Sequence, residues 1–257
     1  MLDYGCLALC ALILILMVYR YDMYDKEPWY MLVLALALGM LTCVAIGNFE
    51  DYLFLEFDSF FKGDYPLEKQ ALVVGVCEEL IKLLAVAVIA IIGSRHFNDP
   101  MDGLIYGAFV GLGFGLNEAL FYLDLRGPNL RLDTLGETPV RLFLHLLFGG
   151  VGGFGLGLAR FSKRWRVWPV IFLVCLGTSI AIHSLWDYWL LKRGEDPLTD
   201  QQRQLTAITL MGILTIFFGF LVMVGARSSR SVFAPASTKK LWGWPFSLLK
   251  RNKKNRS

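Results

Sequence analysis

Seven long hydrophobic runs, separated by short polar connections, divide the chain. They lie at about 5–19, 29–47, 71–92, 103–123, 140–158, 168–191 and 205–226. A membrane helix needs about 20 residues to cross about 30 Å of hydrocarbon, so the first run is short and the others are adequate. Apolar residues are continuous rather than alternating, which excludes an outer-membrane barrel. The pattern predicts an all-α, polytopic membrane helical bundle of about seven transmembrane helices.

Composition agrees with a membrane protein and excludes a soluble one. Of the 257 residues, 56% are hydrophobic and 18% are charged. Soluble globular domains average about 45–50% apolar and about 25% charged residues. The net charge of +3 is modest and the basic residues gather after the last run, so the chain is not expected to bind nucleic acid. The five cysteines lie in apolar runs and form no C-x-x-C metal motif.

The distribution of Lys and Arg predicts the orientation, because these residues stay on the cytoplasmic side of short loops. With the C-terminus cytoplasmic and the N-terminus outside, the inner segments carry 16 Lys and Arg and the outer ones eight. The outer connection 49–69 mixes acids with aromatics, which is typical of an interfacial helix or a packed loop. We therefore expect one membrane domain over 1–226. A basic, aromatic cytoplasmic tail over 227–257 suits anionic lipids.

Ionisable side chains inside the runs are the informative exception to the apolar pattern. Each costs about 2.5–3.5 kcal/mol to insert, so a fold keeps them only if they pair, line a wet cavity or perform chemistry. With about 1.5 Å of rise per residue, the acids and histidines of four runs fall about 8–12 Å below the outer boundary. This common depth predicts one site near the outer face. The set is Glu78, Glu79, Lys82, Glu118, His145, His183 and Asp187.

Spacing predicts contacts within and between these helices. Residues four apart share a helix face, so Glu78 pairs with Lys82, and His183 with Asp187. Glycines at four-residue spacing mark one face of the fourth run and one face of the fifth, which lets two helices approach closely. Glu118 and His145 lie on these faces and are expected to meet. The two glycine stripes are Gly107, Gly111 and Gly115, and Gly149, Gly153 and Gly157.

The residue types suit hydrolysis in a cavity that faces the outer side. Carboxylates and histidines supply a base for water, an acid for the leaving amine and donors for the oxyanion. Neither G-x-S-x-G nor H-E-x-x-H occurs, which argues against a serine acyl-enzyme and a zincin. Glu118, His145 and His183 are candidate ligands, because a His, His, Glu set from different helices can hold Zn²⁺ with an open position for water. A metal-free mechanism, with Glu78 as general base and Lys82 setting its charge, is equally compatible.

Two other classes of function are compatible with buried ionisable groups. A proton- or ion-coupled transporter predicts polar groups through the full membrane depth and an inverted repeat, and neither is visible here. A non-catalytic scaffold or immunity protein of the same fold predicts that loss of Glu78 and Glu79 has no effect.

An ordered set of motifs between residues 20 and 190 resembles the PrsW-type intramembrane proteases, relatives of the CAAX-prenyl and Abi protease group. In that group an Arg stands one position later than Lys82, and a His often stands where Glu118 does. Both differences argue against prenylated substrates. The matching segments are YDMYDKEP at 21–28, CEELIK at 77–82, DGLIYGAFVGLGFGLNEALFY at 102–122 with F-x-x-x-E at 114–118, His145, and H-x-x-x-D at 183–187.

The resemblance implies a multi-pass peptidase of the bacterial cytoplasmic membrane. Its substrate would be a single-span membrane protein, similar to an anti-sigma factor, cut on the extracytoplasmic side in regulated proteolysis. Glu78 and Glu79 would be the catalytic pair. The implied remainder of the site is Glu118, His145 and His183, with Lys82, Phe114, Asn117 and Asp187 in supporting positions.

Overall fold

The computed structural model describes residues 2–22, 25–61, 66–126, 132–161, 168–192 and 200–233. Within these ranges every regular element is an α-helix, so the predicted all-α class is confirmed. Each helix is longer than the hydrophobic run that predicted it, because polar turns extend it at one or both ends. The helices are α1 (Leu2–Tyr21), α2 (Trp29–Phe61), α3 (Leu67–Ile92), α4 (Pro100–Arg126), α5 (Leu132–Phe161), α6 (Trp168–Lys192) and α7 (Asp200–Phe233).

Five of the described helices are long and apolar enough to cross a membrane. These are α1, α2, α4, α5 and α6. The middle of α3 carries three charged residues, and α7 has a shorter apolar stretch at Met211–Arg227. The seven spans and the outward N-terminus remain predictions.

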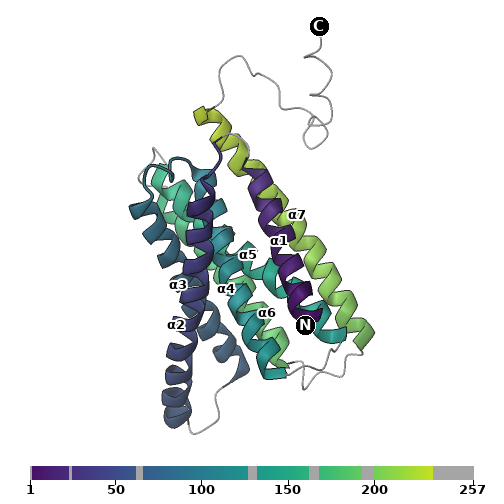
Figure 1. Ribbon diagram of the computed structural model, residues 1–257. Coiled ribbons are helices and arrows are strands. Elements are labelled where there is room, and N and C mark those ends of the chain that lie inside the picture. Colours follow the sequence, from purple (N-terminus) through teal and green to yellow (C-terminus); the bar gives the residue numbers. More distant parts are fainter. Residues whose placement is uncertain are drawn as a thin grey trace.

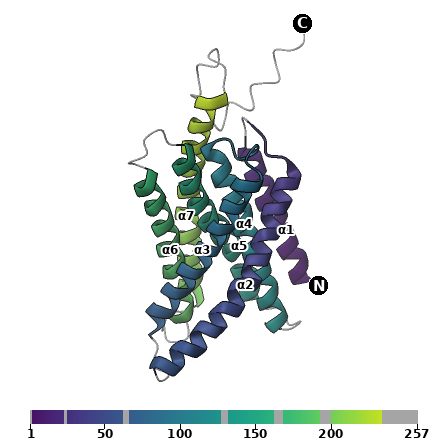
Figure 2. The same cartoon turned by 90° about the vertical axis from the view of Figure 1, so that its left-hand side faces the viewer.

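Helices α4 and α5 form the centre of the bundle. They have the most extensive packing of any helix pair, and α1, α2, α3 and α7 contact α4 around it. Figure 1 shows α1 and α7 on one side of this centre and α2 and α3 on the other. In the view of Figure 2, α6 and α1 lie on opposite sides of the bundle. Because α3 packs against α4, α5 and α6, and α6 packs against α5, side chains from α3 and α6 can meet those of the central pair.

Close approach of α4 and α5 depends on the glycine stripes. A Cβ atom added to Gly107 would collide with the backbone of Gly149, and one added to Gly103 with the backbone of Gly153. Helix backbones in such contact leave no room for any side chain. The predicted packing role of the stripes is confirmed.

A capping box begins α4. Asp99 Oδ1 accepts hydrogen bonds from the N–H groups of Met101 and Asp102, at 2.5 and 3.3 Å. Asp102 Oδ2 accepts in return from the N–H groups of Asn98 and Asp99, at 2.6 and 2.7 Å. These bonds satisfy backbone donors that a helix start otherwise leaves unpaired. Asp99 is therefore the N-cap residue of α4, and Asp102 is its reciprocal partner in the capping box.

The connection between α1 and α2 packs against this helix start. Asp22 Oδ2 accepts from the Glu27 N–H at 2.5 Å, and the Tyr106 hydroxyl donates to Glu27. Both acids are 3% exposed. Burial raises the pKa of Asp22 to about 6. Burial, together with the charge of Asp102, also raises the pKa of Glu27, and the Tyr106 bond opposes that rise.

Two predicted surface segments have different outcomes. Helix α2 continues through Phe61, so most of the connection 49–69 is an extension of that helix. The tail over 227–257 begins inside α7, and its residues 234–257 lie outside the described residues.

Candidate active site

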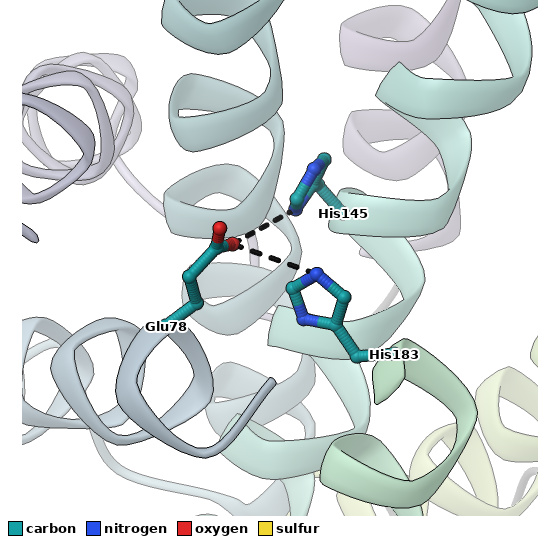
Figure 3. A group of neighbouring side chains, drawn as sticks. All are labelled: Glu78, His145 and His183. Carbon is teal, nitrogen blue, oxygen red and sulfur yellow. Dashed lines mark ion pairs between the residues drawn. The ribbon is translucent and has the colours of Figure 1, made fainter. Parts of the chain in front are cut away.

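Ionisable side chains from four helices meet inside the bundle. Glu78 comes from α3, His145 from α5 and His183 from α6, and Figure 3 shows the three side chains pointing toward one another. All three are buried. Glu118 of α4 joins them through a contact with His145. The convergence expected from depth and spacing is therefore observed.

Lys82 pairs with both glutamates of its own helix. Its Nζ atom lies 3.0 Å from Glu78 Oε2 and 2.8 Å from Glu79 Oε1, and its side chain is fully buried. Nζ also lies 2.9 Å from His145 Nδ1 and 3.9 Å from the centre of the Phe114 ring. Such pairing offsets the cost of burying the three charges. The predicted Glu78–Lys82 pair is confirmed, and Phe114 contacts the same ammonium.

Hydrogen bonds select one tautomer of His145. Lysine has no acceptor, so Nδ1 accepts the bond from Lys82 and the ring proton lies on Nε2. Nε2 lies 2.6 Å from Glu118 Oε2, and Glu118 also forms an ion pair with Arg141. The predicted meeting of Glu118 and His145 is confirmed. The unprotonated Nδ1 lies on the side of Glu78, 4.0 Å from its Oε2.

A second carboxylate orients His183. Its Nδ1 lies 2.8 Å from Glu79 Oε1, an acceptor for the ring N–H. Its Nε2 lies 3.6 Å from Glu78 Oε2 and 3.4 Å from Asp187 Oδ2. The ring stacks on Phe148, with 4.7 Å between ring centres. Each histidine thus turns one nitrogen toward Glu78 and binds a carboxylate with the other.

The residues present fit a divalent metal. Glu78, His145 and His183 each offer one ligand atom, and these atoms lie within 4.8 Å of one another. Two imidazole nitrogens and one carboxylate oxygen are a donor set of catalytic zinc sites, which leave a further position open. Carboxylates on the outer nitrogens of the histidines are typical of the second layer of such sites. In the described part of the chain, no other group of His, Cys, Asp and Glu has this arrangement.

Three sequence-predicted residues lie around this set rather than in it. The metal ligands expected from the sequence included Glu118, whereas the structure places Glu78 between the two histidines and Glu118 behind His145. Asp187 lies beside His183, as its four-residue spacing predicts. Asn117 lies beside Cys43 of α2.

Sequence reasoning missed two residues that hold the carboxylates. The Ser179 hydroxyl lies 2.7 Å from Glu79 Oε2 and 2.8 Å from the Phe148 carbonyl oxygen. Arg141 pairs with Glu118. Both lie four residues before a site histidine and share its helix face, so the same spacing rule could have found them.

Glu50 is a further carboxylate near the site. It interacts electrostatically with Glu78, Asp187 and His183. Among the described residues its buried Oε1 has no hydrogen-bond partner. Because the hydrophobic run that predicted α2 ends at 47, the sequence placed Glu50 in the outer connection rather than in the helix. A buried oxygen without a partner is available to a donor on water or on a bound peptide.

A profile of the PrsW family of intramembrane metalloproteases matches residues 27–226 of the chain, a range that contains the whole site. The chain belongs to this family. Its relatives include Protease PrsW of Bacillus subtilis (strain 168), which is 32% identical over 174 residues, or 67% of this chain and 75% of the relative. Protease PrsW of Clostridioides difficile (strain 630) is 25% identical over 171 residues, or 66% and 71%. No solved structure matches significantly.

Membership in the PrsW family makes the chain a peptidase and a multi-pass integral membrane protein, like its bacterial relatives. The family description also names a metal, and the Glu78, His145 and His183 donor set fits one.

Proposed function

We propose that this PrsW-family peptidase cuts a membrane-tethered protein near the extracytoplasmic face, with Glu78, His145 and His183 holding Zn²⁺. The proposal rests on these three side chains, whose ligand atoms lie within 4.8 Å of one another. The chemistry that a zinc ion supplies is polarisation of a carbonyl and activation of water at neutral pH.

Residues around the ligands keep them ready to bind. Glu79 holds the ring proton of His183 on Nδ1, and Glu118 holds that of His145 on Nε2. In the neutral rings the inward nitrogens are then free of protons, which a metal ligand requires. Lys82 balances the negative charge of the two α3 glutamates. The ligands are therefore oriented before a substrate arrives.

A metal-free form of the reaction is the second candidate, and the position of Lys82 favours it. Nζ lies between Glu78 Oε2 and His145 Nδ1, at 3.0 and 2.9 Å. A metal bound to these two atoms would require Lys82 Nζ to release both of them; its bond to Glu79 Oε1 does not involve either atom. In the metal-free form Lys82 stays in place, and Glu78 acts as the general base for water.

Metal analysis of the purified full-length protein separates the two forms. The metal-bound form predicts one zinc per chain, loss of cleavage of a membrane-tethered reporter after chelation, and recovery when zinc is added. Undiminished cleavage by zinc-free protein in the presence of chelator would refute that form and support Glu78 as the base.

The substrate class and the side of cleavage rest on the sequence. The bias of Lys and Arg supports an outward site, and the motif resemblance supports a single-span substrate similar to an anti-sigma factor. The segment CEELIK at 77–82, with two adjacent glutamates followed by a lysine, supports a distant relation to the CAAX-prenyl and Abi group. The basic, aromatic tail supports contact with anionic lipids.

A further inference from the structure

An apolar groove lies between α5, α6 and α7. Its volume is about 550 Å³. In the described parts of these helices, both α6 and α7 pack against α5, whereas α6 and α7 have no comparable packing with each other. Among the residues that the structure describes, no charged side chain lines the groove, and the one hydroxyl is that of Thr178. Its walls are Leu144 of α5, Thr178, Ile182, Leu185, Trp186 and Trp189 of α6, and Ile213, Leu214 and Phe217 of α7.

The groove lies at the same level of the bundle as the candidate active site. Leu144 directly precedes His145 on α5. On α6, the groove residues Ile182 and Trp186 directly precede His183 and Asp187. Consecutive helical residues point about 100° apart, so the groove and the site occupy neighbouring faces of the same two helices. A molecule bound in the groove would therefore contact the faces of α5 and α6 that adjoin the faces carrying His145 and His183.

The groove has a buried floor and an exposed rim. Trp186 and Leu214 are 8% and 4% exposed, whereas Leu185 and Ile213 on the rim are 67% and 58% exposed. Trp186 stacks on Trp189, with 5.3 Å between ring centres, which gives the floor a rigid aromatic surface. A rim of this kind on a membrane helix opens toward lipid, so an apolar segment can reach the floor from within the bilayer.

We propose that this groove docks the transmembrane helix of the substrate, an inference that rests on the proposed peptidase function. The α6 wall from Thr178 to Trp189 rises about 16 Å, or about three helical turns. An apolar helix binds such a groove with residues spaced three and four apart. A lipid chain also fits an apolar groove, but it brings no peptide bond to the neighbouring site. The position of the groove beside the site, on the same two helices, therefore favours the substrate helix.

Photo-crosslinking tests the occupant directly. A photoreactive residue replaces Ile213 in full-length Glu78→Gln protein, reconstituted in vesicles with a single-span reporter substrate. The matched control carries the probe at Ile216, which is on the same helix, 76% exposed and outside the groove. We expect a crosslink to the reporter's transmembrane segment from position 213 and only lipid adducts from position 216. Lipid adducts alone at both positions, or equal reporter crosslinks from both, overturn the proposal.

Filling the groove tests its role in cleavage. Ile213→Trp, with Ile216→Trp as control, is assayed on the tethered reporter and on a short soluble peptide with the same cleavage sequence. The groove variant should raise KM for the reporter about tenfold with kcat unchanged, since it removes binding common to ground and transition states. Its kinetics on the soluble peptide should match the control. An unchanged KM for the reporter, or an equal loss on both substrates, contradicts docking in the groove.

The two experiments distinguish failure of the docking proposal from failure of the proposed function. A reporter crosslink from position 213, without any cleavage by the wild-type chain, refutes the proposed cleavage and supports the groove. Cleavage that depends on Glu78, without that crosslink and with no effect of Ile213→Trp, supports the function and refutes the groove.

Discussion

Two carboxylates at the outer nitrogens of the histidines determine which ring atoms face the site. Glu79 lies 2.8 Å from His183 Nδ1, and Glu118 lies 2.6 Å from His145 Nε2. Both pairs join different helices, so each bond also fixes where one helix sits relative to the next. A carboxylate in this position holds the ring and strengthens the opposite nitrogen as a ligand. Glu79 and Glu118 therefore act through the histidines.

Neutralising either carboxylate should weaken metal binding without removing a ligand. We expect Glu79→Gln and Glu118→Gln each to lower zinc affinity about 10–100-fold, the usual effect of changing a second-layer partner. Titration against a competing chelator measures the affinity, and circular dichroism checks folding. Glu68→Gln is the matched control, because Glu68 is exposed on the first turn of α3. Wild-type affinity in both site variants would contradict the orienting role.

The sequence predicted contacts within a helix better than the roles of residues between helices. Spacing identified the Glu78–Lys82 pair correctly, because residues four apart share a face in any helix. Spacing does not determine which helix faces that surface. It therefore predicted that Glu118 approaches His145. It did not reveal that Glu78, rather than Glu118, faces His145 Nδ1 and His183 Nε2.

Helix packing depends on glycines at defined positions of α4 and α5. A Cβ on Gly149 would collide with the backbone of Gly107, whereas one on Gly152 meets no atom within 4 Å. Both glycines lie inside α5, where alanine is intrinsically better by about 1 kcal/mol. We expect Gly149→Ala to lower the thermal midpoint in detergent and Gly152→Ala to leave it unchanged or raise it. Similar midpoints for both variants would contradict the close α4–α5 packing.

The α1–α2 connection should make stability depend on pH through Glu27. Burial raises the pKa of Glu27 in the folded chain, so the folded form holds a proton that the unfolded form releases above its ordinary pKa. The contribution of Glu27 to stability is therefore present at low pH and is lost as pH rises from about 4.5, its ordinary pKa, to about 9, its pKa in the folded chain. Glu27→Gln imitates the protonated acid and should reduce this loss of thermal midpoint. A pH profile identical to that of the wild-type chain would contradict the assignment.

Hydrophobic runs predicted the existence of each helix and left its ends undetermined. The run for the second helix stops at 47, yet α2 continues to Phe61. The added residues mix polar and aromatic side chains, so they are helical without forming a continuous apolar run. This extension carries Glu50 toward the site. Where apolar residues end, hydropathy gives no signal for continued helix, and only packing against neighbouring helices decides it.

At the scale of the whole molecule, the charges excluded from lipid and the charges kept inside serve different purposes. Most Lys and Arg lie in connections and in the tail, where they predict the orientation. Ionisable side chains inside the bundle, among them Glu78, Lys82 and Glu118, meet where α3, α4, α5 and α6 come together, next to a groove that opens between α6 and α7. Composition could predict a membrane bundle. It could not predict which helices leave a gap, since that depends on side-chain shape along every contact.

Cleavage by a Glu78→Gln variant tests the central claim most directly. The variant and Glu68→Gln, a control on the same helix, are reconstituted as full-length proteins with a membrane-tethered reporter, and product is measured over time. Gln keeps the size of the side chain but removes the charge that both the metal-bound and the metal-free forms require. We predict at least about a hundredfold loss for Glu78→Gln, equivalent to about 2.7 kcal/mol of transition-state stabilisation, and wild-type rates for the control. Wild-type cleavage by folded, membrane-inserted Glu78→Gln would contradict the account.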